Sequence, residues 1–462
     1  MNKEKRHVIV IPYPAQGHVI PMMELSQLLV SNGIKVTFVN SEHNHHRVLQ
    51  SLPQSDGLHH QVDMVSIADG LEPGEDRIQL GKVTEITWRV MPVELEALIN
   101  RLNLNQGDND KINCLVADWS VGWAFQVAEK LRLRSAAFWP ATAAAVAVSS
   151  TIPKLITDGV IDSDDGRILN GQTIERFFPA MPEMSSAILS LWRCYDDEAT
   201  KEIIFDILRK DSILCRSAER LLCNSSPELE AAVFSQFPNI IPVGPLLASN
   251  RLANEVGHFW PQDLDCIPWL DQQPPDSVIY VAFGSYTVFD QSQFEELALG
   301  LELTNMSFLW VVRQDITPNS GNAYPAGFKE RVHDRGLIVG WAPQQQVLSH
   351  PSVAIFISHC GWNSTIEGVA NGVPFLCWPY FGDQFINKTY ICDVWKTGLG
   401  LSREGESSII RKGEIQDKVE HILKDRGYKE RALNLQVKAM ASVREGCSYK
   451  NFNSFIEWIK NN

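Results

Sequence analysis

The sequence WAPQQQVLSHPSVAIFISHCGWNSTIEGVANGVPFLCWPYFGDQ, residues 341–384, decides the fold. Its run VAIFIS (353–358) is apolar and β-branched and has the length of a strand. HCGWNS follows directly, with good N-cap residue types at Asn363 and Ser364. TIEGVANG (365–372) then indicates a short helix that stops at a glycine. The segment therefore predicts a strand, a turn and a helix N-terminus in direct succession.

A turn that enters a helix can bind an anion. The first N–H groups of a helix have no partner within it, and the helix dipole is positive at this end. His359 ends the predicted strand, where its ring could donate to a phosphate oxygen. An ordinary strand–turn–helix unit is the alternative, and this pattern alone leaves both interpretations open.

Other residues of the segment have two interpretations each. Trp341 is a stacking floor for a nucleobase or a core tryptophan. Glu367 is a capping-box glutamate on the first helical turn or an acceptor for ribose hydroxyls. Asp383 and Gln384 follow a second predicted strand, FLCWP (375–379), where a carboxylate and an amide suit the vicinal diol of a sugar. The functional interpretations together describe a nucleotide-sugar site.

The segment resembles the signature box of plant UDP-dependent glycosyltransferases of family 1, the secondary-product class. The box is long and ungapped, so it is far more specific than a single glycine motif. The matching positions are Trp341, Ala342, Gln344, His350, Pro351, His359, Gly361, Trp362, Asn363, Ser364, Glu367, Pro374, Pro379, Asp383 and Gln384.

Length and charge restrict the class of protein. A chain of 462 residues is too long for one core, so two domains are expected. The net charge of −14 disfavours nucleic acid as a partner. Nine scattered cysteines without a CxxC pair predict reduced thiols and a cytoplasmic protein. The apolar run at 8–11 is too short for a signal peptide, and the C-terminus is too polar for stable membrane insertion.

Strands and helices alternate in the first half of the chain. Predicted strands at 8–11 and 34–40 flank a helix that ends at Gly33, which implies a parallel sheet. Ligands bind beyond the carboxyl ends of such strands, and His18 lies there. A single loop histidine is more often a surface residue than a base, but the resemblance implies that His18 is the general base.

Asp118 ends the apolar run at 114–117. It is either the N-cap of a helix that starts near Ser120 or a carboxylate that orients a catalytic histidine. The resemblance implies the second role. It also implies, more weakly, that the hydroxyl of Thr142, the predicted cap of the next helix, contacts the sugar.

Two further polar clusters are expected to be solvated loops. The histidines at 43, 45 and 46 lack the ligand spacing of a zinc site. The Asp-Ser-Asp at 162–164 could hold a metal bridging a diphosphate, as in other transferases, but no apolar strand leads into it. The resemblance likewise implies that no metal and no cofactor are needed, with UDP-glucose as co-substrate.

The second half repeats the alternation. The strand predicted at 219–226 is expected to be the last of the first half, and the polar run at 248–258 is expected to be flexible. A buried strand at 277–283 ends at Gly284 and Ser285, where Ser285 can donate to a phosphate. Another strand is predicted at 307–313, and helices are predicted from 412 onward.

The resemblance implies an α/β protein of GT-B type, with two facing Rossmann-like domains that each contain a parallel sheet flanked by helices. The expected divisions are an acceptor-binding domain (1–247), a linker (248–262), a UDP-sugar-binding domain (263–440) and a C-terminal helix that packs back on the first domain (441–462). A monomer is expected.

The implied reaction is inverting transfer of glucose from UDP-glucose to a hydroxyl group. His18 takes the proton of the acceptor and Asp118 stabilises the imidazolium. UDP is held by Ser285, Trp341, Ala342, Gln344, His359, Gly361, Trp362, Asn363, Ser364 and Glu367. The sugar is held by Asp383, Gln384 and Thr142, with the Trp362 region closing over it.

The acceptor is expected to be a small lipophilic phenolic, flavonoid or terpenoid. Its pocket is expected near the loop after Pro14, the Trp88 region and residues 181–192, which are apolar and aromatic. A C-glycosylating variant, a hydrolase or epimerase, and a catalytically inactive nucleotide-sugar-binding protein stay open. A dinucleotide-dependent oxidoreductase is disfavoured, because no GxGxxG follows the first strand.

Overall fold

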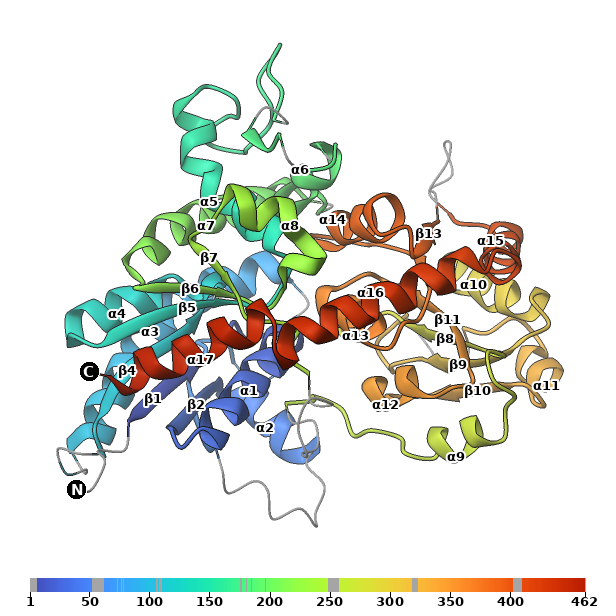
Figure 1. The fold of residues 1–462 in the computed structure, drawn as a ribbon, viewed down its shortest axis with the longest axis horizontal. Helices are drawn as coiled ribbons and strands as arrows, with labels where there is room; N and C mark the ends of the chain where they lie inside the picture. Colours follow the sequence, from blue (N-terminus) through green and yellow to red (C-terminus); the bar gives the residue numbers. More distant parts are fainter. Residues whose placement is uncertain are drawn as a thin grey trace. The chain divides into compact units, whose positions relative to one another are not determined.

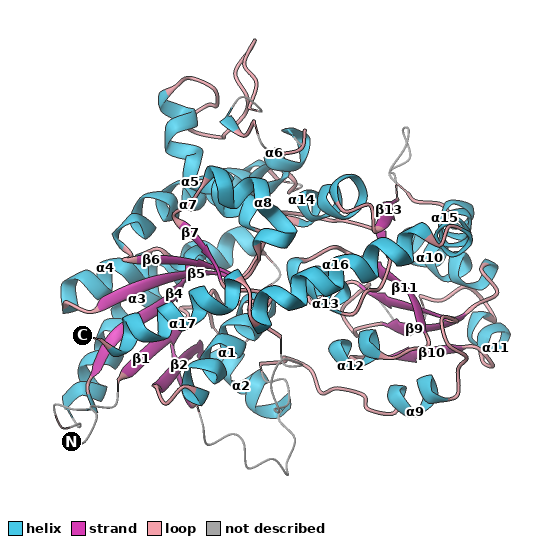
Figure 2. Cartoon of the chain, viewed as in Figure 1, coloured by secondary structure: helices cyan, strands magenta, loops and turns pink. Residues whose placement is uncertain are grey.

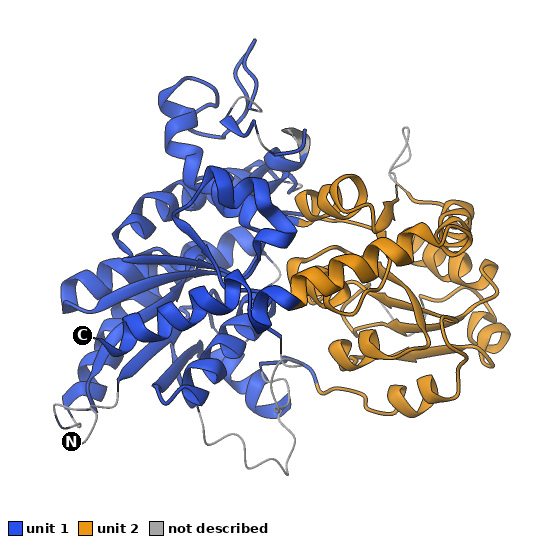
Figure 3. Cartoon of the chain, viewed as in Figure 1, with its two compact units in different colours: residues 1–260, 381–383, 441–462 blue, residues 261–380, 384–440 orange. Residues whose placement is uncertain are grey.

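The computed structural model describes residues 6–461 except 52–61, 73, 76, 78, 105–106, 108–109, 175–176, 180, 184, 196, 248–256, 318–322 and 402–408. Most of the polar run expected to form a linker (248–256) therefore lies outside the described residues. The chain divides into two compact units (Figure 3). Unit 1 comprises residues Met1–Trp260, Phe381–Asp383 and Ala441–Asn462, and unit 2 comprises Pro261–Tyr380 and Gln384–Met440.

Unit 1 is built on a seven-stranded parallel sheet in the order β3-β2-β1-β4-β5-β6-β7 (Figure 1). Its strands are β1 (His7–Ile11), β2 (Lys35–Ser41), β3 (Asp63–Ile67), β4 (Ile112–Asp118), β5 (Arg134–Trp139), β6 (Arg220–Cys223) and β7 (Ile240–Pro242). β7 pairs with β6, so the expectation that the strand near 219–226 ends this half was wrong. The short run IIP was too brief to stand out as a strand in the sequence.

The helices of unit 1 alternate with its strands (Figure 2). They are α1 (Gln16–Ser31), α2 (Glu42–Ser51), α3 (Leu80–Leu104), α4 (Trp123–Leu131), α5 (Ala143–Thr157), α6 (Ser185–Arg193), α7 (Glu198–Leu214), α8 (Pro227–Gln236) and α17 (Cys447–Lys460). The expected histidine loop is α2, so this prediction was wrong. Glu42 in its first turn and the buried Val48 favour the helix over a loop.

Unit 2 contains a six-stranded parallel sheet in the order β10-β9-β8-β11-β12-β13. Its strands are β8 (Val278–Ala282), β9 (Ser307–Val311), β10 (Gly336–Val339), β11 (Val353–Ser358), β12 (Phe375–Cys377) and β13 (Gly398–Gly400). Its helices are α9 (Cys266–Asp271), α10 (Gln291–Leu303), α11 (Phe328–Val332), α12 (Gln344–Ser349), α13 (Trp362–Ala370), α14 (Gln384–Thr389) and α15 (Lys412–Lys424). α16 (Gly427–Arg444) runs from unit 2 into unit 1.

Both sheets have fully buried central strands. β1 and β11 read HVIVI and VAIFIS, and every residue of both is buried. Such continuous apolar runs are typical of parallel strands that are covered on both faces. This architecture confirms the predicted α/β class with two parallel sheets flanked by helices.

The C-terminal helix α17 packs within unit 1. Phe455, Ile456 and Ile459 lie in the same apolar core as residues of β1 and β2. Arg134 donates to the carbonyl of Trp458 at 2.7 Å and lies 3.9 Å from the centre of its ring. No helix among the described residues combines the length and apolarity that a membrane crossing requires.

Candidate functional site

The order of strands in unit 1 reverses between β1 and β4, which are hydrogen-bonded neighbours. The strand that follows β1 in the chain, β2, lies on one side of this pair. The strand that follows β4, β5, lies on the other side. Loops after such a pair of strands diverge and leave a crevice where α/β proteins bind ligands. His18 follows β1 in the first turn of α1, and Asp118 is the last residue of β4.

His18 and Asp118 form a hydrogen-bonded dyad. Nδ1 of His18 lies 2.7 Å from Oδ2 of Asp118, although 100 residues separate them in the chain. The carboxylate is fully buried, whereas 26% of the histidine side chain is exposed. Oδ1 of Asp118 accepts from the amide of Ser120 at 2.9 Å. The aspartate therefore caps the following turn and contacts the histidine at the same time.

The charge of the dyad is set by competing effects. Burial disfavours the imidazolium, but the charge and hydrogen bond of Asp118, together with the charge of Asp383, outweigh it and raise the pKa of His18 above 6.5. With Nδ1 directed at the carboxylate, Nε2 is the nitrogen left to accept a proton. The arrangement suits a general base whose cationic form is stabilised after proton transfer.

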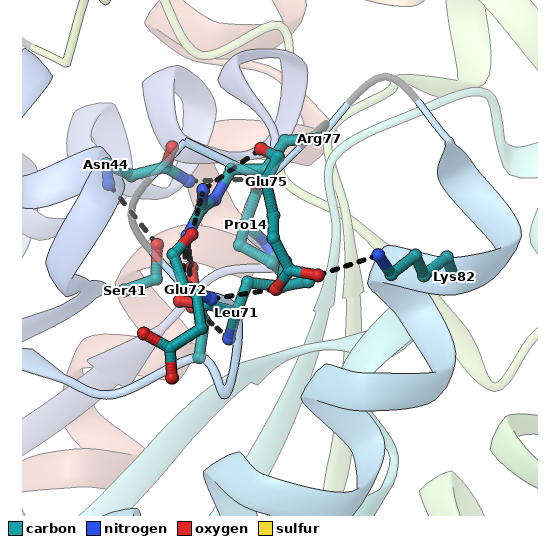
Figure 4. Close-up of polar contacts among 9 residues, drawn as sticks. Pro14, Ser41, Asn44, Leu71, Glu72, Glu75, Arg77 and Lys82 are labelled. Carbon is teal, nitrogen blue, oxygen red and sulfur yellow. Dashed lines mark hydrogen bonds and ion pairs between the residues drawn. The ribbon is translucent and has the colours of Figure 1, made fainter.

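The loop before His18 is held by contacts with α2 and α3. Tyr13 packs its ring against His18 with 5.1 Å between centroids, and its hydroxyl lies 2.8 Å from that of Thr84 on α3. Asn44 of α2 is buried and donates to the carbonyl of Pro14 at 2.8 Å (Figure 4). These contacts fix the backbone before the histidine.

A second loop near this region is organised by Arg77 (Figure 4). Its guanidinium donates to the carbonyl groups of Leu71, Glu72 and Glu75 and pairs with Asp69 at 3.3 Å. Five donors in a planar group allow one arginine to satisfy several carbonyls of a curved backbone. Glu75 also pairs with Lys82 at 2.8 Å.

Behind the dyad lies a buried acid that the sequence did not reveal. Asp211 of α7 is fully buried, and its Oδ1 accepts from the amide of Gly122 at 2.8 Å. A Cβ at residue 122 would lie 2.5 Å from that oxygen, so the close approach requires glycine. Burial raises the pKa of Asp211 well above its ordinary value, and the charge of Asp118 adds to this. Asp118 is the carboxylate that faces His18.

Thr142 lies buried at the start of α5. It is the N-cap residue of α5, but its own side chain does not cap the helix. Its buried hydroxyl donates to Glu230 at 2.6 Å, and Glu230 also accepts from the amides of Ala143 and Ala144 and from Ser225. The capping group is therefore Glu230, and in this structure the Thr142 hydroxyl is directed into the protein rather than toward a ligand.

The sheet of unit 2 reverses between β8 and β11 in the same way. Gly284 and Ser285 follow β8, and His359 follows β11. A Cβ at Gly284 would lie 2.5 Å from Nε2 of His359, and one at Gly361 would lie 2.4 Å from it. The ring is therefore enclosed by two glycines, which allow it to lie directly against the backbone.

The ring of His359 is neutral. Burial and the positive charge of Arg313 lower its pKa to about 4. Within the part of the chain that the structure describes, its Nδ1 has no hydrogen-bond partner. A neutral imidazole carries one N–H, and a hydrogen bond with the backbone of Ala282, which opposes the lowering of the pKa, ties the ring to the end of β8.

The sequence pattern predicts Arg313 only as the last residue of a strand. It is 2% exposed and donates to the carbonyl groups of Gly284 and Thr287, the latter at 2.8 Å. It also pairs with Asp315 at 2.9 Å. Arg313 thus holds the loop that carries Ser285 and adds positive charge beneath it. The signal in the sequence was an arginine two residues after the apolar run that forms β9 (Ser307–Val311).

The helix after His359 begins earlier than predicted. α13 starts at Trp362 with Gly361 as N-cap, and its first internal bond runs from the amide of Thr365 to the carbonyl of Gly361 at 2.9 Å. Asn363 and Ser364 therefore lie in the first turn, and the expected N-cap at these residues was wrong. Gly361 precedes the helix because the tight turn around His359 excludes a side chain there.

Glu367 lies in the second turn and does not form a capping box. Gln344 connects this glutamate to its surroundings: its amide nitrogen donates to Glu367 at 2.6 Å and to the hydroxyl of Ser364 at 2.9 Å. Its oxygen accepts from Tyr280 at 3.1 Å. The structure thus brings Gln344, Ser364 and Glu367 together as one polar cluster at α12 and α13.

The tryptophans of the box differ in exposure. Trp341 is half-buried directly before α12, and its carbonyl accepts from Asp263 at 2.9 Å. Its neighbour Ala342 is buried. Trp362 is 3% exposed and packs against Trp395 with 6.5 Å between ring centroids. The indole of Trp362 is therefore part of the interior, which leaves its backbone rather than its ring to contact a ligand.

Asp383 and Gln384 are adjacent but belong to different units. Asp383 lies in unit 1, close enough to His18 to raise the pKa of that histidine. Gly382 before it donates to Cys194 at 3.0 Å and accepts from Ser190 at 3.1 Å, both near the end of α6. Gln384 begins α14, is buried, and accepts from the amide of Tyr380 at 2.7 Å.

The acidic loop at 162–164 is a hydrogen-bonded turn. Asp162 accepts from the amide of Asp164 at 2.9 Å, and Arg167 lies within 3.9 Å of Asp162. Among the described residues, no group of three or more histidine, cysteine or acidic side chains has a geometry suited to a metal ion.

Only part of the region predicted to bind the acceptor is exposed to solvent. Trp88 is half-buried on α3, but Trp192 is fully buried and donates to the carbonyl of Gly166 at 3.2 Å. Trp192 therefore belongs to the core of unit 1. The expected range 181–192 also includes residue 184 and the side chains of 185 and 186, which lie outside the described part of the chain.

The chain matches known protein families over most of its length. Residues 261–439 match the family model described as UDP-glucoronosyl and UDP-glucosyl transferase, and residues 4–63 match that of a glycosyltransferase N-terminal domain. The chain is 45% identical to UDP-glycosyltransferase 83A1 of Arabidopsis thaliana, over 99% of this chain and 98% of the relative. It is 34% identical to linamarin synthase 1 of Manihot esculenta, over 98% and 96%.

Solved structures show the same architecture. Os79 from O. sativa in complex with UDP is 25% identical and matches with a TM-score of 0.80 over 98% of this chain and 100% of that chain. A UDP-glucosyltransferase from Polygonum tinctorium capable of glucosylating indoxyl is 26% identical, with a TM-score of 0.80 over 100% of both chains.

Proposed function

Because this chain belongs to the plant family 1 UDP-glycosyltransferases, we propose that it transfers glucose from UDP-glucose to a hydroxyl group of a small lipophilic metabolite, with inversion at the anomeric carbon. The observation that carries the proposal is the contact of 2.7 Å between His18 and the buried Asp118 at the switch point of the first sheet. Glucose as the donor sugar is supported by relatives named as glucosyltransferases.

In the proposed reaction, Nε2 of His18 removes the proton of the acceptor hydroxyl. Asp118 stabilises the imidazolium through its hydrogen bond and its charge. The acceptor oxygen attacks the anomeric carbon on the face opposite to UDP, so one displacement converts an α-linked donor into a β-glucoside. General base catalysis of this kind contributes about 10²–10⁴-fold to the rate.

The leaving UDP is assigned to residues after β8, β10 and β11. Trp341 stacks on uracil beside Ala342, while Gln344 and Glu367 contact the ribose. His359, Ser285 and the first turn of α13, from Gly361 to Ser364, hold the diphosphate. The charge of Arg313, which donates to the carbonyl of Gly284 in this loop, favours the developing negative charge. We propose that these groups make a divalent metal unnecessary. Asp383 and Gln384 contact the glucose hydroxyls.

The proposal is tested with purified protein, UDP-glucose, excess EDTA and a panel of phenolic, flavonoid, terpenoid and alcohol acceptors. Addition of one hexose to an acceptor, detected by mass spectrometry, supports transfer, and proton NMR of the product reports the anomeric configuration. Release of UDP without a glycosylated product indicates a hydrolase instead. Transfer that depends on added Mg²⁺ contradicts the metal-independent mechanism.

Two matched variants distinguish a catalytic role of His18 from a role in folding. His18→Ala should lose about 10²–10⁴-fold in kcat and retain UDP binding by calorimetry. His46→Ala replaces an exposed histidine on α2 of the same unit and should retain activity. Retained activity in His18→Ala would remove the histidine from the mechanism.

A further inference from the structure

Two cysteine side chains that are distant in sequence are in contact in unit 2. Cys377 ends β12 and is fully buried, whereas Cys392 lies in the π-helical turn Tyr390–Val394 and is half-buried. Their sulfur atoms are 3.8 Å apart. Burial raises the pKa of Cys377 well above its ordinary value, and the neighbouring thiols of Cys360 and Cys392 add to this. Both thiols are reduced in this structure.

Cys392 lines a surface cavity of about 510 Å³ with a positive rim. Lys388, Lys396 and Arg431 contribute three cationic groups, and Asp393 is an acidic side chain among the lining residues. The guanidinium of Arg431 is held in place, because it donates to the carbonyl of Lys396 at 2.6 Å and lies 4.9 Å from the centre of the Tyr428 ring. Small anionic molecules should therefore concentrate next to the Cys392 sulfur.

We propose that Cys392 is a modification site for small disulfides that carry carboxylates, and that Cys377 is the resolving thiol. Three features of the geometry carry this inference: the cavity gives a reagent access to one sulfur, its cations attract an anionic reagent, and the second thiol is already in contact with the first. Cys377 ends β12 and Cys392 lies 15 residues later, in the turn before β13, and only packing in the fold brings the two sulfur atoms together.

The chemistry proceeds in two exchange steps. The thiolate of Cys392 attacks one sulfur of the reagent RSSR, a bond forms between Cys392 and that sulfur, and RS⁻ leaves and takes a proton from water. Cys377 then loses its proton to solvent and attacks the Cys392 sulfur. The protein disulfide forms and the second RS⁻ is released, so two protein thiols and RSSR yield one disulfide and two RSH.

The second step should be the slower one. Only a thiolate attacks a disulfide, and burial keeps Cys377 protonated. The mixed disulfide on Cys392 should therefore appear first and convert to the Cys377–Cys392 disulfide over time. Raising the pH should speed the conversion, because it increases the ionised fraction of Cys377.

The test uses oxidised glutathione as the probe on the full chain. Samples are blocked with iodoacetamide at intervals, digested without reductant and analysed by mass spectrometry. The wild type should show a glutathione adduct on Cys392, followed by a peptide pair joined through Cys377 and Cys392. Cys377→Ala should accumulate the adduct, and Cys392→Ser should form neither product. Thermal unfolding of each variant establishes that it is folded.

Two controls keep the proposal falsifiable. Cys447 is exposed, so Cys447→Ser should behave like the wild type at Cys392. Lys396→Gln should slow adduct formation at Cys392 by about two- to fivefold with oxidised glutathione, as expected for one exposed charge, but not with uncharged hydroxyethyl disulfide. Adducts on Cys447 alone, or a wild-type adduct on Cys392 that never converts to the Cys377–Cys392 disulfide, would overturn the proposal.

Discussion

His18 Nδ1 and Asp118 Oδ2 lie 2.7 Å apart because two strands that are distant in the chain end side by side. β1 and β4 are neighbours in the sheet, with Ile11 paired to Ala117. A histidine shortly after the first strand and an aspartate at the end of the other are thereby brought into contact. The pair connects a partly exposed imidazole to a fully buried carboxylate.

Asp118→Asn should move the acidic limb of the pH–rate profile to lower pH. The charge and hydrogen bond of Asp118 raise the pKa of His18, so their loss lowers that pKa and leaves more neutral base at acidic pH. The maximal rate should fall by about 10²–10⁴-fold, because the imidazolium is no longer stabilised. The profile of kcat/KM against pH provides the measurement. An unchanged acidic limb would show that another group controls it.

Gly361→Ala should weaken UDP binding without straining the backbone. Its φ of −57° suits alanine, but the new Cβ would lie 2.4 Å from Nε2 of His359 and displace the ring. Loss of one hydrogen bond to a charged diphosphate predicts an affinity about 10- to 100-fold lower by calorimetry. Gly413→Ala is the control, since a Cβ there meets no atom within 4 Å. Equal affinities in both variants would contradict the assignment of His359.

Arg313→Met should raise the pKa of His359 from about 4, because Arg313 is the charge that lowers it after burial. UDP affinity should fall as well, since the loop at Gly284 and Thr287 loses its donors. NMR titration of the histidine ring measures the first effect and calorimetry the second. Arg335→Lys, which alters an arginine bonded to the carbonyls of Glu302 and Met306, should leave the His359 pKa unchanged.

Glu230→Gln should destabilise unit 1 by about 2–4 kcal/mol. The carboxylate accepts four hydrogen bonds in a fully buried position, and the amide nitrogen of glutamine would face two donors instead. Urea unfolding measures the loss. Glu228→Gln changes an exposed acid on the same helix and should stay within about 0.5 kcal/mol of the wild type. Equal stabilities of the two variants would refute this account of the cap.

Local patterns in the sequence determined most of the elements. The runs at 8–11 and 353–358 are apolar over a strand length, and both are buried strands. The alternation of strands and helices determined the parallel sheets, because parallel neighbours require crossover connections. The signature box determined the family, because many residue types recur at defined spacings without gaps.

Tertiary structure decided which groups meet. Asp211 is buried next to the turn after Asp118, Arg313 bonds to the loop after β8, and three of the four donors around Glu230 come from the start of α5. These contacts join segments 26 to 89 residues apart. Hydrophobic periodicity does not encode such pairings, since it reports only which face of an element is buried. The direction of the Thr142 hydroxyl and the contact between Cys377 and Cys392 were decided in the same way, by packing between elements whose register only the complete fold defines.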